Sequence, residues 1–180
     1  AAVEAAYPAE IARITDALRA GLPTLVECEK ELTPYLYKAV RDRLKKEGRS
    51  LLYLDGRPIP EMPPLQPGMG LVGTIVFYLR EAVRGAVNER VLVLPHLDLL
   101  TTSVGGLTSE AREVIPLLYE NPELVFLGFK DPSFPLPKVI ENLFPRQEHL
   151  LGVPRDRLRH LVTQRESRKL SNARGLKGPQ

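Results

Sequence analysis

The amino-acid sequence predicts an α/β fold, a three-layer αβα sandwich around a five-stranded parallel sheet. Short apolar runs alternate with segments of helical periodicity along most of the 180 residues. This alternation is typical of parallel strands joined by right-handed crossovers. The composition, 43% apolar and 26% charged, is that of a globular domain. A chain of this length can bury roughly 70% of its unfolded surface, which is enough for a full core.

The first half of the chain predicts two helices, each followed or preceded by a short strand. Apolar residues three or four apart, a proline in the first turn and a glycine after the last turn mark the helices. The predicted elements are a helix over 8–18, a strand over 24–28, a helix over 34–46 and a strand over 51–54. The segment 57–70 holds five prolines, and no regular element survives that many missing amide donors.

The second half repeats the alternation. The predicted elements are a helix over 71–87, a strand over 91–94, a helix over 108–119, a strand over 124–128, a short helix over 136–143, a weaker strand over 149–151 and a last helix over 154–169. Asn121-Pro122 ends the helix before the fourth strand. We find no internal repeat.

The net charge of +3 is unevenly distributed. Residues 153–180 carry eight Lys or Arg against two acids, a local net of +6, so the preceding 152 residues carry a net of −3. A basic end on an acidic body disfavours nucleic acid as the partner of the body. The longest apolar runs are far shorter than the roughly 20 residues that span a bilayer, and a single cysteine excludes an internal disulfide. We therefore expect a cytoplasmic protein without a membrane segment.

Ligands of open parallel sheets bind where the strands end. The first strand is followed by Glu27-Cys-Glu-Lys-Glu-Leu-Thr-Pro34, which has three glutamates and no glycine. A phosphate cradle needs glycines, so that backbone amides can face the anion. The third strand is followed by Pro95-His96-Leu97-Asp98. His96 and Asp98 are two residues apart, and we expect no His–Asp pair between them.

Several segments, taken in order, are similar to the motifs of one family. Residues 91–100 resemble a Walker B strand in which Pro95 and His96 replace the acidic pair and Asp98 keeps the second Asp. Residues 27–34 occupy the place of Walker A, and Lys38 begins a Lys-Ala-Val sequence common in the next helix. Over about residues 8–165 the chain thus resembles the AAA+ ATPases, which implies a P-loop NTPase fold.

Three further segments carry the same resemblance. The segment 125–131 resembles the sensor-1 strand with Asp131 in place of Asn, and Arg146 matches the second Arg of the segment that supplies arginine fingers between subunits. A pore-loop-like segment consists of Leu71, Val72 and Gly73. The residues that the resemblance assigns to a degenerate nucleotide site are Lys30, Asp98 and Asp131.

The departures from the family pattern predict loss of catalysis. Walker A lacks its functional residues, Walker B lacks both catalytic acids, and Leu143 replaces one arginine of the finger segment. Such losses cost several orders of magnitude in rate. The resemblance therefore implies a pseudo-ATPase domain over 1–165, followed by a basic linker or the start of a lid over 166–180. We expect no catalytic residue and no cofactor in this segment, with ATP and Mg²⁺ belonging to a larger parent AAA+ protein.

The partner expected from the resemblance is a second AAA+ module or another copy of the chain, in assembly, inter-subunit contact or partner docking within a remodelling machine. Two alternatives stay open: an atypical nucleotide-binding NTPase, and a stand-alone interaction module that binds protein or, through its tail, nucleic acid. Cys28 is interpreted as a buried apolar residue. His149 and His160 show no metal-ligand spacing with it, so no metal site is expected.

Overall fold

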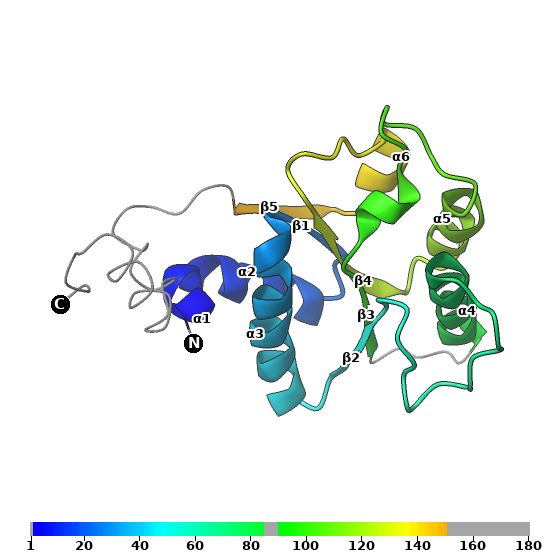
Figure 1. The fold of residues 1–180 in the computed structure, drawn as a ribbon. Coiled ribbons are helices and arrows are strands. Elements are labelled where there is room, and N and C mark those ends of the chain that lie inside the picture. The colour runs from blue at the N-terminus through cyan, green and yellow to red at the C-terminus, as the bar shows by residue number, and fades with distance from the viewer. Residues whose placement is uncertain (1, 85–89, 151–180) are drawn as a thin grey trace, which may run out of the picture.

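Five strands form a single sheet in which every neighbouring pair is parallel (Figure 1). The computed structural model describes residues 2–84 and 90–150. The strand order across the sheet is β2–β3–β4–β1–β5. The strands are β1 (Thr24–Cys28), β2 (Ser50–Tyr53), β3 (Arg90–Leu94), β4 (Val125–Lys130) and β5 (Arg146–Leu150). The predicted α/β class and the five-stranded parallel sheet are confirmed.

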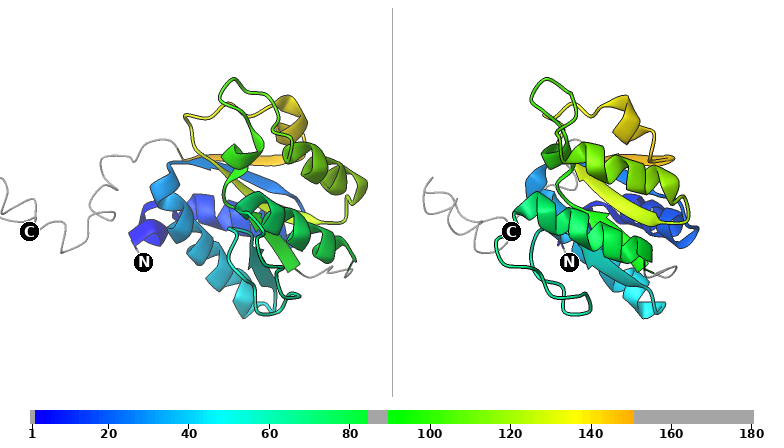
Figure 2. Two further views of the ribbon diagram at one scale, coloured as in Figure 1. Left: turned by 45° about the vertical axis from the view of Figure 1, so that its right-hand side comes forward. Right: turned by 90° about the vertical axis from the view of Figure 1, so that its right-hand side faces the viewer.

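Helices connect the strands and cover both faces of the sheet. They are α1 (Ala2–Ala6), α2 (Pro8–Arg19), α3 (Thr33–Lys46), α4 (Leu71–Arg84), α5 (Ala111–Glu120) and α6 (Lys138–Glu141), with the 3₁₀ turns η1 (Lys30–Leu32) and η2 (Leu97–Leu100). Figure 1 shows α2 and α3 on one side of the sheet and α4 and α5 on the other. Figure 2 shows α4 and α5 packed side by side on their face. The architecture is consistent with three layers.

Two separate hydrophobic cores result, one on each face of the sheet. Alternate residues of the central strands supply both: Val91 and Val93 of β3 join α1, α2 and α3, whereas Leu92 and Leu94 join α4 and α5. A strand buried on both faces has to be apolar at every position. This requirement explains the uninterrupted apolar run of β3, which the sequence shows.

The edge strand β5 has a different composition. Its sequence is Arg-Gln-Glu-His-Leu, and only Leu150 is fully buried. Charged side chains on an edge strand protect it against indiscriminate aggregation. Because these residues form no apolar run, the sequence predicts only the last residues of the strand.

The other differences from the predicted elements are small. Helix α1 was not predicted, β5 begins three residues earlier than expected, and α5 begins at Ala111 rather than at 108. The irregular segment 57–70 contains no helix or strand, as predicted. The predicted helix over 154–169 and the segment 166–180 lie outside the described residues, as do residues 85–87 of the third predicted helix. Across residues 2–84 and 90–150, no helix combines the length and the apolar character needed to cross a membrane.

The order of the strands creates a switch point between β1 and β4. The chain leaves β1 through α3 on one face of the sheet, and leaves β4 through α6 on the opposite face. In open α/β sheets, the two loops that diverge at such a point border the crevice in which ligands bind, outside the carboxyl ends of the strands. This crevice is the place to examine for function.

Candidate functional site

The loops that follow β1, β3 and β4 meet at the switch point and bring three predicted residues together. Lys30 comes from η1 after β1, Asp98 from η2 after β3, and Asp131 directly follows β4. They are far apart in sequence, yet the parallel strands deliver all three to one edge of the sheet. The structure thus brings Lys30, Asp98 and Asp131 together, and their role in binding a nucleotide stays a prediction.

An ion pair joins the first two residues. The Lys30 Nζ donates to Asp98 Oδ2 at 2.8 Å. The Asp98 side chain is only 13% exposed, whereas that of Lys30 is 43% exposed. The second oxygen of Asp98, Oδ1, is buried and accepts no hydrogen bond from the described residues. The Lys30 ammonium is therefore the group that balances the negative charge of the Asp98 carboxylate.

The Asp131 carboxylate binds the backbone of the loop that carries Lys30. The Lys30 backbone N–H donates to Asp131 Oδ2 at 3.3 Å, and the Ser133 N–H donates to Asp131 Oδ1 at 2.9 Å. The hydroxyl and backbone N–H of Ser133, and then the backbone N–H and charge of Lys30, stabilise the carboxylate and lower the pKa of Asp131. This carboxylate ties the β1 loop to the β4 loop across the crevice.

His96 is a member of the site that sequence reasoning missed. The strand β3 ends at Leu94 and η2 begins at Leu97, so His96 lies in the short connection between the two elements. Partial burial and then the charge of Lys30 lower the pKa of His96, while the carboxylates of Asp98 and Asp55 act in the opposite direction. No hydrogen bond joins His96 to Asp98 among the described residues. The imidazole therefore lies within the field of the Lys30–Asp98 pair without being bonded to it.

A second charged row crosses the sheet just inside the same edge. Glu27 Oε2 lies 3.2 Å from Lys130 Nζ in β4 and 3.3 Å from His149 Nδ1 in β5. These residues are register partners of Glu27 on the two neighbouring strands. Cross-strand pairs of opposite charge stabilise a sheet modestly. The sequence offers one signal for this row, a charged residue near the end of three different strands.

The residues of the crevice do not fit a nucleotide triphosphate with its Mg²⁺. The loop after β1 has no glycine, and Glu29 and Glu31 flank Lys30 on its exposed surface. Pro34 is the second residue of α3 and removes one amide donor from the turn where a phosphate would bind. The Lys30 ammonium is already engaged by Asp98. Among the described residues of the crevice there is neither a cradle of backbone amides nor an unpaired cation.

Apolar packing beneath the crevice fixes η2 and the end of β4. A Cβ added to Gly128 would lie 2.6 Å from Phe144 Cζ and 2.8 Å from Leu97 Cδ1. The rings of Phe126 and Phe144 meet edge to face at 5.2 Å. Glycine at this position lets both side chains press against the strand, which anchors the turn that carries Asp98.

Cys28 lies at the end of β1, directly under the loop. Its thiol is buried, and its Sγ lies 3.7 Å from Thr33 Oγ1. Burial is the main cause that raises the pKa of Cys28 to about 11. A thiol in this state is a poor nucleophile, in agreement with its interpretation as a core residue.

The remaining predicted residues lie elsewhere. Leu71, Val72 and Gly73 form the first turn of α4 rather than a loop; Leu71 is 41% exposed, and Val72 packs against the core. Their role at a pore stays a prediction. Arg146 opens β5 and therefore lies at the amino edge of the sheet, away from Lys30. Its role between subunits also stays a prediction.

Among the residues that the structure describes, no three His, Cys, Asp or Glu side chains are placed to hold a metal ion. No protein-family model matches the sequence, and no curated protein matches it either.

Proposed function

We propose that this chain is a non-catalytic AAA+ type domain with a P-loop NTPase fold. It serves assembly, inter-subunit contact or partner docking within a larger ATP-driven remodelling protein, while another module hydrolyses ATP. The five-stranded parallel sheet and the ordered resemblance of its segments support the fold assignment. The observation that supports the loss of nucleotide binding and hydrolysis is the Lys30–Asp98 ion pair in the crevice.

The physical reason is that the charged side chains of the crevice, Lys30 and Asp98, already pair with each other. Binding a triphosphate there requires breaking the contact between Lys30 Nζ and Asp98 Oδ2, which leaves a carboxylate that is 13% exposed without a partner. Glu29 and Glu31 would then face the phosphate oxygens with charge of the same sign. No run of glycine amides is present to offset these costs.

Isothermal titration of the full chain with Mg-ATP tests the proposal. We expect no saturable heat up to millimolar nucleotide and no phosphate release above background. Binding at micromolar concentration, or turnover lost in a Lys30→Met variant, would refute it. A matched Lys38→Met variant, which changes an exposed lysine of α3, controls for the loss of one positive charge.

An atypical nucleotide-binding NTPase is the second candidate. The observation in its favour is that Lys30, Asp98 and Asp131 converge, and that Asp98 Oδ1 is buried without a partner among the described residues. This candidate predicts that Asp98→Ala abolishes a measurable activity while Glu120→Ala, a change at the amino edge, does not. Wild-type protein without any activity eliminates it.

A further inference from the structure

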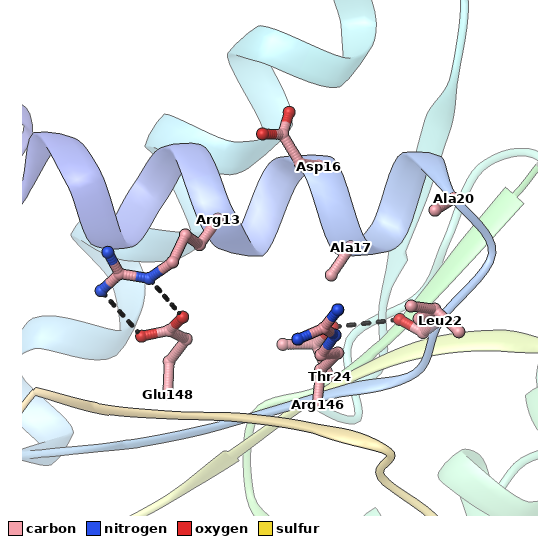
Figure 3. Close-up of a pocket in the computed structure, with 8 residues that line it drawn as sticks. All are labelled: Arg13, Asp16, Ala17, Ala20, Leu22, Thr24, Arg146 and Glu148. Atoms are coloured by element: carbon pink, nitrogen blue, oxygen red, sulfur yellow. Dashed lines mark hydrogen bonds and ion pairs between the residues drawn. The ribbon is translucent and has the colours of Figure 1, made fainter.

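A pocket of about 330 Å³ lies at the opposite, amino edge of the sheet, between α2 and the start of β1 and β5 (Figure 3). Ala17 of α2 and Ala20, the residue that follows this helix, have small side chains, which leaves the space open. Its eight lining residues are Arg13, Asp16, Ala17, Ala20, Leu22, Thr24, Arg146 and Glu148. We call it the Arg146 pocket.

Three of the four charged residues in the Arg146 pocket are already engaged. Arg13 donates two hydrogen bonds to Glu148, at 2.7 and 3.2 Å, and Figure 3 shows the two side chains facing each other. Asp16 accepts a hydrogen bond from Arg19. Arg146 is exposed and forms no ion pair or side-chain hydrogen bond with any described residue. The uncommitted charge of the pocket is therefore a guanidinium.

A guanidinium presents its N–H donors in a planar fork that matches a carboxylate in a bidentate arrangement. The wall beside it is fixed, because the Arg13–Glu148 pair links α2 to β5. Ala17, Ala20 and Leu22 add an apolar surface. The complement of this pocket is a carboxylate carried on a short aliphatic stem.

The pocket also adjoins an open strand edge. Within the described part of the chain β5 is the last strand of the sheet and pairs only with β1. Alternate backbone groups of an edge strand point outward and can pair with an added strand. Arg146 and Glu148 are two residues apart on β5 and both line the pocket, so an added strand would run past it.

From these observations we infer that β5 and the Arg146 pocket bind an extended, acidic peptide segment of a partner protein. The peptide adds a strand to the β5 edge and places a Glu or Asp side chain against Arg146. The inference rests on the docking role proposed above and names the chemistry of the docked partner. It requires no nucleotide at the switch crevice.

The probe is a blocked hexapeptide of alternating Thr and Val with one central Glu, and its matched control carries Gln instead. Amide spectra of the ¹⁵N-labelled full chain are recorded during titration with each peptide. We expect saturable shifts confined to 13–24 and 146–150 with the Glu peptide, and at least tenfold weaker binding of the Gln peptide. Equal binding of both peptides, or shifts elsewhere, would overturn the inference.

Two variants separate the charge from the space. Arg146→Met removes the guanidinium, whereas Ala17→Leu fills the pocket and keeps the guanidinium. Each variant is expected to weaken binding of the Glu peptide about tenfold. Arg112→Met changes an exposed arginine of α5 and should have no effect. Thermal unfolding confirms that each variant folds, and unchanged affinity in both folded pocket variants contradicts the inference.

Two further arms identify other occupants. If acetate produces the same shifts at the same concentration as the peptide, the pocket is a simple carboxylate site and the strand addition is wrong. If the shifts appear on concentrating the chain alone and disappear in Arg146→Met, the occupant is a second copy. Failure of peptide binding leaves the Mg-ATP titration unchanged, so the two proposals fail separately.

Discussion

Removal of the Lys30 charge should destabilise the protein more than removal of its partner's charge. In Lys30→Met, the Asp98 side chain, 13% exposed, loses its ion-pair partner, and its Oδ1 is already unpartnered among the described residues. An unsatisfied buried group of this kind costs about 1–3 kcal/mol. In Asp98→Asn, Lys30 is 43% exposed and can turn into water, so the expected loss is that of a half-exposed ion pair, about 1 kcal/mol or less.

Urea unfolding of the full chain measures both effects. With a slope of about 2 kcal/mol per molar urea, Lys30→Met should lower the midpoint by about 0.5–1.5 M. The double variant Lys30→Met/Asp98→Asn should be more stable than Lys30→Met alone, because it carries no uncompensated carboxylate. The reasoning fails if Lys30→Met is as harmless as the exposed control Lys38→Met, or if the double variant is the least stable.

Three other predictions concern the surroundings of the crevice. Gly128→Ala should cost about 1–3 kcal/mol in urea unfolding, because its Cβ overlaps Phe144 and Leu97; Phe144→Leu should relieve part of this cost, and additive losses would contradict the steric cause. His96 should titrate below its usual pKa of 6.5 in an NMR pH series, and Lys30→Met should raise its pKa. Because the pKa of His96 is lower in the folded state than in the unfolded state, the free energy of unfolding should fall as the pH drops through 6.5 and level off below the folded-state pKa. An unshifted pKa of His96 would count against this description. Cys28 should react with a thiol reagent at neutral pH only after unfolding, because burial raises its pKa to about 11, and rapid labelling of the native chain would show that the loop over it opens.

The sequence predicts the sheet well where burial demands an uninterrupted apolar strand. The bounds of β1 are predicted to the residue, and those of β3 to within one residue. The start of β5 is missed, because Arg146 to Glu148 are polar and only edge pairing with β1 makes them a strand. Helix α1 is missed because Pro8 marks a helix start, and the tertiary contacts of Val3 and Ala6 that stabilise the preceding turn are not local.

The site is predicted in part for a comparable reason. Parallel strands deliver their ends to one edge, so the convergence of Lys30, Asp98 and Asp131 follows from the strand assignment. The position of His96 depends on where β3 ends and η2 begins, a boundary that the sequence leaves undefined. The Arg146 pocket depends on the small size of Ala17 against the start of β5, and no local pattern reveals a contact between elements so far apart in sequence.

The central claim is that the charged residues at the switch point pair with one another and that the crevice binds no nucleotide. Calorimetric titration of the full chain with Mg-ATP at low salt tests this claim most directly. The Lys30–Asp98 ion pair predicts no saturable binding up to millimolar nucleotide. Micromolar binding that Lys30→Met abolishes and Lys38→Met preserves would contradict it.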